Sequence, residues 1–67
     1  QDFKSAIEAF TKAIGENPDK PDGYMRRAIA YAELSKKDES IADLKKAADL
    51  GHDEARAALK AYFNIDY

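Results

Sequence analysis

The sequence contains no cysteine and only one histidine, and these two shortages exclude several kinds of chemistry. Without cysteine there is neither a disulfide nor a thiolate ligand for zinc. His52 lies in a turn, and there is no second histidine with which it could complete a metal site. The three glycines are scattered and form no phosphate-binding loop. We therefore expect no catalytic residue, no cofactor, no metal site and no enzymatic activity.

An excess of positive charge and a long apolar run are also missing. Lysine and arginine number 11 and aspartate and glutamate 13, so the net charge is −2. Nonspecific binding to nucleic acid needs a basic surface that displaces counterions, so we expect no nucleic-acid partner. Three basic pairs occur in the sequence: Arg26-Arg27, Lys36-Lys37 and Lys45-Lys46. Acidic residues lie near them, including Asp38, Glu39, Asp43 and Asp49. We therefore interpret these pairs as parts of an ordinary surface that carries charges of both signs. No apolar run approaches the ~18–20 residues of a membrane-spanning helix, so we expect no membrane partner.

The sequence is instead rich in alanine and poor in β-branched residues, which favours helices. Apolar periodicity and turn residues predict an all-α chain with four helices, at about residues 2–16, 21–34, 37–50 and 53–63. Pro18 should end the first helix, and Gly51 should close the third in a left-handed conformation. As N-caps we expect Asp19 for the second helix, Ser35 or Asp38 for the third and Asp53 for the fourth.

The pattern repeats when the chain is shifted against itself by 34 residues. This shift places Ile7 on Ile41, Lys12 on Lys46, Ala13 on Ala47, Asp19 on Asp53, Met25 on Leu59 and Arg26 on Lys60. A period between about 20 and 50 residues is typical of stacked structural repeats.

The repeating residues resemble a known family. A 34-residue, two-helix unit with Ala6, Phe10, Ala13 and Pro18 in one helix, and Tyr24, Ala28 and Tyr31 in the next, resembles the tetratricopeptide repeat. Arg27, Ser40 and His52 depart from the leucine, alanine and proline that are usual at those places. The resemblance implies antiparallel helical hairpins in a short right-handed α-solenoid. The segment AADLGHDEARAAL also resembles the junction of Sel1-like repeats, which we keep as an alternative subgroup.

In this interpretation residues 1–67 form a single domain that is part of a longer array. Residues 1–20 are the second helix of one repeat, residues 21–54 a complete repeat and residues 55–67 a final helix. The first helix then lacks its usual partner and leaves an apolar face open: Phe3, Ile7, Phe10 and Ile14. Upstream helices, a second copy of the chain by dimerisation or helix exchange, or repacking of the same helices could cover this face.

The resemblance also implies a function, because the first helix of each unit lines a concave, peptide-binding surface in that family. The matching positions here are Asp22, Met25, Arg26, Ile29 and Glu33, followed by Arg56, Leu59, Lys60 and Phe63. Their basic groups suggest an acidic peptide or a C-terminal carboxylate as ligand. We therefore predict a protein-interaction module that binds a protein or peptide partner. Self-association through the first helix is the alternative, and an accessory segment of an enzyme comes third.

Overall fold

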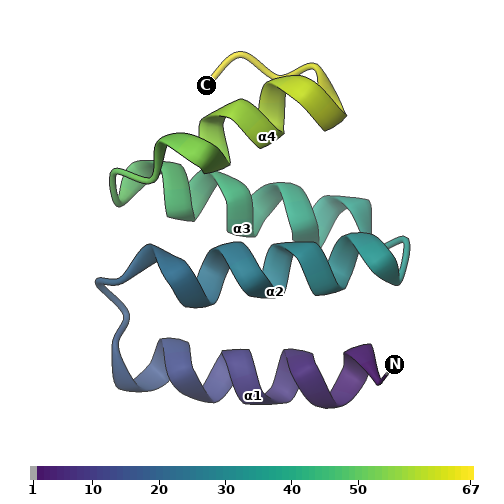
Figure 1. Cartoon of the computed structure of the whole chain (residues 1–67), viewed down its shortest axis with the longest axis vertical. Coiled ribbons are helices and arrows are strands. Elements are labelled where there is room, and N and C mark those ends of the chain that lie inside the picture. Colours follow the sequence, from purple (N-terminus) through teal and green to yellow (C-terminus); the bar gives the residue numbers. More distant parts are fainter. Residues whose placement is uncertain (1) are drawn as a thin grey trace.

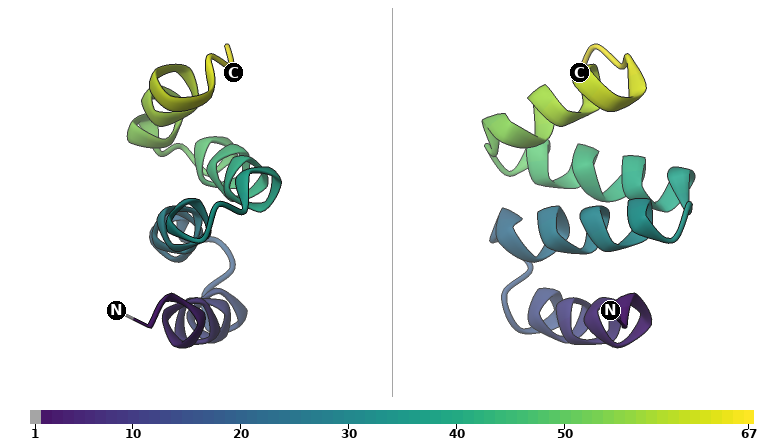
Figure 2. Two further views of the ribbon diagram at one scale, coloured as in Figure 1. Left: turned by 90° about the vertical axis from the view of Figure 1, so that its right-hand side faces the viewer. Right: turned by 45° about the vertical axis from the view of Figure 1, so that its right-hand side comes forward.

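The structure, a computed structural model, describes residues 2–67 as a stack of four antiparallel helices, so residue 1 of the predicted domain lies outside it. The helices are α1 (Phe3–Glu16), α2 (Pro21–Glu33), α3 (Lys37–Asp49) and α4 (Asp53–Phe63). Figure 1 shows them following one another along the stack, with connections at alternating ends. The left view of Figure 2 shows the helices alternating from side to side, as in a run of hairpins. The all-α prediction is confirmed, with helix bounds that differ by one residue at most.

The helices end as the turn residues predict. After α3, Gly51 has a φ of +91°, its N–H donates to the carbonyl of Ala48 (2.9 Å), and the N–H of His52 donates to the carbonyl of Ala47 (3.1 Å). This pair of bonds closes a helix around a left-handed residue, so the prediction for Gly51 is confirmed. Ser35 takes the same left-handed place after α2, with a φ of +60°.

The predicted N-caps are wrong for α2, α3 and α4. Lys20, Lys36 and His52 occupy these positions, and none of them makes a side-chain cap hydrogen bond. Asp38 and Asp53 lie inside the first turn of their helices instead, where a carboxylate still interacts favourably with the helix dipole. Asp2 is the N-cap of α1 and accepts a hydrogen bond from the N–H of Ser5 (3.1 Å).

The two turns between hairpins differ in length, and this changes the register of the last helix. The first residues of α1 and α3, Phe3 and Lys37, lie 34 positions apart, whereas those of α2 and α4, Pro21 and Asp53, lie 32 apart. Pro18 lies in a turn of residues 17–20, while the left-handed Gly51 allows a shorter turn, residues 50–52. The shift by 34 is therefore wrong for α4.

The buried core lies between α2, α3 and α4 and consists largely of alanine. Its members are Ala28, Leu44, Ala47, Ala48, Ala55 and Leu59. Small side chains let these helices approach closely, and Ser40 fits among them because its hydroxyl donates to the carbonyl of Ala28 (2.8 Å). Beyond α4 the chain folds back, and the N–H of Ile65 donates to the carbonyl of Leu59 (3.0 Å).

Arg27 joins three helices. Its Nε–H and Nη2–H donate to the two carboxylate oxygens of Asp43 on α3 (2.7 and 2.8 Å), and its Nη1–H donates to Thr11 on α1 (3.1 Å). The guanidinium also lies 5.9 and 5.8 Å from the ring centres of Tyr24 and Tyr31. The hydrogen bonds to Asp43 raise the pKa of Arg27 above its ordinary value. The interpretation of both residues as ordinary surface is wrong, because Asp43 is only 6% exposed.

Removing one partner of the Arg27–Asp43 pair should destabilise the fold. We expect Asp43→Ala to lower the free energy of unfolding by about 2–4 kcal/mol, because it leaves a half-buried guanidinium unpaired. The double variant Arg27→Leu/Asp43→Leu should recover much of this loss, because no charge is then left without a partner. Urea denaturation measures both. Arg26→Leu on the exposed neighbouring position is the control, and an Asp43→Ala variant as stable as this control would contradict the role of the pair.

The cap at Asp2 should make α1 sensitive to acid. Hydrogen bonds from the hydroxyl and the N–H of Ser5 lower the pKa of Asp2 below its ordinary 3.8. The stabilisation is therefore complete above the unfolded value and is lost as the pH falls through the lower folded pKa. Between about pH 5 and pH 2, the stability of the wild type should fall relative to Asp2→Asn, which caps a helix without titrating. Urea denaturation at several pH values measures the free energy of unfolding of both proteins. A difference between them that stays constant over this pH range would contradict the prediction.

Candidate functional site

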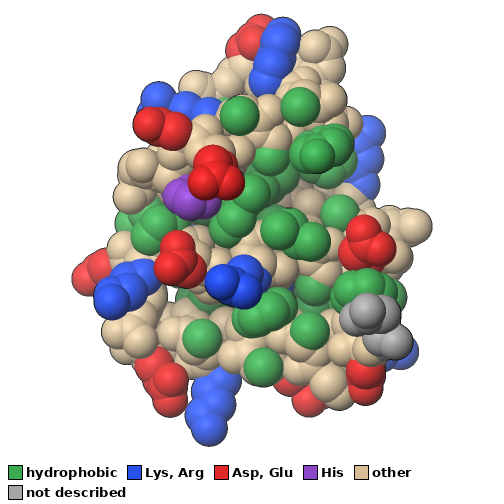
Figure 3. Space-filling model, in the orientation of Figure 1, with side chains coloured by type: hydrophobic (Ala, Val, Ile, Leu, Met, Phe, Trp, Pro, Cys, Tyr) green, Lys and Arg blue, Asp and Glu red, His purple; other side chains and the backbone are tan. Residues whose placement is uncertain are grey.

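A groove lies between α2 and α4, with α3 as its floor. Its volume is about 550 Å³. The lining is almost entirely apolar: Met25, Ala28, Ile29, Ala32, Glu33, Ser40, Leu44, Ala58, Tyr62 and Phe63. Figure 3 shows hydrophobic side chains gathered over this face, with charged side chains around them. We call it the α2–α4 groove.

Two large hydrophobic side chains of the groove are open to solvent. Ile29 on α2 is 54% exposed and Tyr62 on α4 is 80% exposed. Single exposed apolar residues are common, but two that line one apolar concavity form a patch that is typical of a binding surface. These residues give the groove an anchor on each wall.

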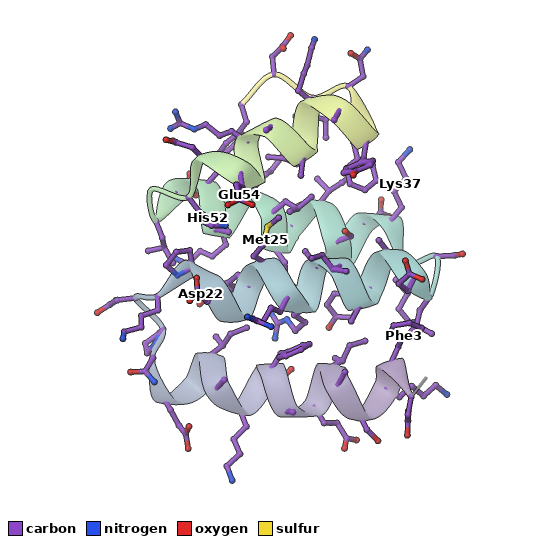
Figure 4. All side chains as sticks on the ribbon, viewed as in Figure 1. Phe3, Asp22, Met25, Lys37, His52 and Glu54 are labelled. Carbon is purple, nitrogen blue, oxygen red and sulfur yellow. The ribbon has the colours of Figure 1, made fainter. Side chains whose placement is uncertain are left out.

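The charged residues of this face lie at its margins. Glu33 lines the groove near the end of α2, and Glu54 lines an adjoining hollow of about 290 Å³ together with Met25, Ala58 and Tyr62. Figure 4 shows Asp22, Met25 and Glu54 on the same face of the molecule. A hollow of about 270 Å³ on the α1 side of Ile29 is lined by Arg26.

The structure brings together only part of the predicted binding face. Met25, Ile29, Glu33 and Phe63 line the groove, and Arg26 lines the hollow beside it. Asp22 on α2 is in neither lining, and three predicted members on α4 are absent from both as well: Arg56, Leu59 and Lys60.

Each of these three residues has a different place. Leu59 is fully buried in the core. Lys60 is ion-paired with Asp66 in the folded-back tail, its Nζ 3.0 Å from Oδ1. Arg56 lies near Tyr67 of the same tail, where its charge acts on the phenol. Their assignment to the concave face is therefore wrong.

On α4, the lining residues that sequence reasoning missed include Glu54, Ala58 and Tyr62. One signal could have found them. The acidic pair Asp53-Glu54 is typical of a first helical turn, and a helix that starts there places Ala58 and Tyr62 four residues apart on one face.

The predicted self-association face is not bare. Phe3, Ile7, Phe10 and Ile14 are all half-buried, on the side of α1 that packs against α2. Figure 4 shows Phe3 rising from α1 toward α2. Packing against α2 thus half-buries these residues, which was one of the expected ways of covering the face, and their role in self-association stays a prediction.

The exposed residues of α1 include two alanines among polar and charged side chains. Ala9 and Ala13 are exposed, although their equivalents on α3, Asp43 and Ala47, are buried. None of the residues described in α1 is fully buried. Self-association of the chain and its membership of a longer array stay predictions.

Other kinds of site were sought in the same residues. No group of three metal-ligating side chains occurs among residues 2–67. Among the four helices of this range, none combines the length and the apolar character needed to cross a membrane.

Comparisons with known proteins agree with this geometry. The family model for the tetratricopeptide repeat matches residues 21–50, which comprise α2, α3 and the turn between them. The chain is therefore a member of the tetratricopeptide repeat family. The Sel1-like subgroup stays a prediction, and no solved structure matches the chain.

The chain is similar to parts of several known proteins, one of which is named for the same repeat. It is 38% identical over 50 residues to small glutamine-rich tetratricopeptide repeat-containing protein 2 of Mycosarcoma maydis, covering 75% of this chain and 14% of that protein. It is 43% identical over 61 residues to the Hsp70-Hsp90 organizing protein of Triticum aestivum, with coverages of 90% and 10%. It is 33% identical over 60 residues to a protein SGT1 homolog of Bos taurus, with coverages of 90% and 18%. The chain thus spans less than a fifth of each of these relatives.

The contact between α1 and α2 can be tested at two glycines. A Cβ added at Gly23 would lie 2.8 Å from Cγ1 of Ile14, whose branched side chain is stiff, so α1 would have to move. We expect Gly23→Ala to lower the free energy of unfolding by about 1–2 kcal/mol. Gly15→Ala, which meets nothing within 4 Å, should raise it by up to about 1 kcal/mol. Urea denaturation measures both free energies of unfolding. An equal increase for the two variants would contradict the close contact between Gly23 and Ile14.

Proposed function

We propose that the chain is a protein-interaction module that binds a peptide segment of a partner protein in the α2–α4 groove. The observation that carries this proposal is the exposure of Ile29 and Tyr62 on facing walls of one apolar concavity. Burial of a large apolar side chain is worth about 1.5–3 kcal/mol, so contact with both anchors supplies a substantial part of a micromolar affinity.

The mechanism requires no bond to be made or broken. Of the described lining residues, Ser40 and Leu44 are buried, so the floor of the groove is part of the core. A site built on packed helices changes little on binding, which limits the entropy lost by the protein. The ligand contributes apolar side chains that replace water against Met25, Ile29 and Tyr62.

The family supports this proposal. The name of the wheat relative describes a protein that organizes Hsp70 and Hsp90, which are themselves proteins. We extend to this chain only the general role of a scaffold for protein contacts. The expected preference for an acidic or C-terminal carboxylate is not part of the proposal, because it relied on Arg56 and Lys60, which lie away from the groove.

The proposal also interprets the organisation of the chain. Residues 21–54 act as one complete repeat, and α4 supplies the second wall of its groove. Residues 2–20 act as the second helix of a preceding repeat.

The groove can be tested with peptides selected from a phage-displayed random library against the wild-type chain. Their Kd values are then measured by fluorescence polarisation against two variants. Tyr62→Ser removes an anchor and should weaken binding by about tenfold or more, the loss typical of a central aromatic contact. Tyr67→Ser removes a 48% exposed tyrosine outside the groove lining and should leave the Kd unchanged.

Circular dichroism spectra confirm that both variants keep their helices. Peptides that bind Tyr62→Ser as tightly as the wild type would contradict the location of the site. A selection that enriches no peptide would contradict the function.

A further inference from the structure

The carboxylates around the α2–α4 groove indicate the charge of its ligand. Of the described residues that line the groove, only Glu33 is charged, and only Glu54 is charged in the adjoining hollow. We propose that the groove recognises an apolar peptide segment with a lysine or arginine at each end. This inference rests on the proposed function of the groove.

The two carboxylates are placed to contact opposite ends of one ligand. Glu54 lines its hollow together with Met25, and Glu33 follows Met25 by eight positions on the same helix. Eight residues of helix correspond to about 12 Å. An extended peptide covers the same distance in about four residues, at roughly 3.3 Å each. Cations at the first and fifth positions of a peptide therefore match this spacing, with three apolar side chains between them.

Both carboxylates are available. Glu33 and Glu54 are exposed, and within residues 2–67 neither has a cationic partner within the 4.0 Å of an ion pair. Lysine or arginine from a ligand would thus meet a free carboxylate at each end. Exposed pairs of this kind contribute modest affinity but strong discrimination against the wrong charge.

No lysine or arginine is among the described residues that line the groove or the adjoining hollow. Lys60 is paired with Asp66, and Arg56 lies beside Tyr67. Arg26 lines the hollow on the α1 side, where Asp2 also lies. An acidic peptide in the α2–α4 groove would therefore meet two carboxylates and no lining cation, which opposes its binding.

Three synthetic peptides test the inference, each capped at both ends. They share the apolar centre Leu-Phe-Leu and carry two lysines, two glutamines or two glutamates as their first and last residues. Each is titrated into the isotopically labelled chain, and the Kd and the site are read from NMR shift changes. The variants are Glu33→Gln/Glu54→Gln and, as a control with the same change of net charge on α1, Glu8→Gln/Glu16→Gln.

We expect the lysine peptide to bind the wild type about threefold to tenfold tighter than the glutamine peptide, and the glutamate peptide to bind weakest. The preference should shrink as salt rises above about 0.15 M, because the pairs are exposed. It should disappear in Glu33→Gln/Glu54→Gln and persist in Glu8→Gln/Glu16→Gln. The glutamine peptide should bind all three proteins equally.

The outcomes separate the two proposals. Equal Kd values for the lysine and glutamate peptides, with shifts at Ile29 and Tyr62, would overturn the charge preference and leave the groove in place. A preference that survives in Glu33→Gln/Glu54→Gln would overturn the assigned carboxylates. Peptides that shift no groove residue, whatever their charge, would overturn the binding function together with this inference.

Discussion

The length of the turn at Gly51 determines which face α4 turns toward the groove. This turn and α3 before it are each one residue shorter than their counterparts, the turn after α1 and α1 itself, so α4 begins two residues earlier than a constant 34-residue repeat would place it. Because each residue of an α-helix turns by about 100°, two residues rotate the helix face by about 200°. In the structure, Tyr62 and Phe63 of α4 line the groove, whereas Lys60 is paired with Asp66 outside the groove lining. The lengths of α3 and of the turn at Gly51 therefore influence which residues α4 contributes to the candidate site.

The alanine-rich core explains how such a short chain presents a groove at all. Ala28, Ala47 and Ala55 are almost completely buried and bring three helices close together, but each contributes little apolar area. Arg27 adds a different kind of support, because its bonds to Thr11 and Asp43 join α1 and α3 through α2. It occupies a place where leucine is usual, and the polar cluster is satisfied because each guanidinium nitrogen has a partner. A small core is thus supplemented by directional contacts.

Much of the fold could be predicted from the sequence because its signals are local. Apolar periodicity, Pro18 and Gly51 set the helices to within a residue. The candidate site was harder to predict from the sequence, because it depends on how two helices pack against each other. Identities at a spacing of 34 residues supported a constant period, and nothing in that comparison showed that α3 and the turn after it are each one residue shorter than α1 and its turn. The burial of Asp43 could not be predicted either. A charged residue in a polar stretch is normally assigned to the surface, and only the structure shows that Arg27 pairs with it.

The groove and the open side of α1 are separate features of this molecule. Every fully buried residue of the described chain belongs to α2, α3 or α4, and these three helices alone line the groove. The apolar side of α1 packs on α2, while Ala9 and Ala13 face outward on its other side. A helix that covered these alanines would add core to α1, whereas Tyr62 lies on α4, three helices further along the stack. What precedes α1 in a repeat array therefore affects the stability of the stack more than the chemistry of its ligand.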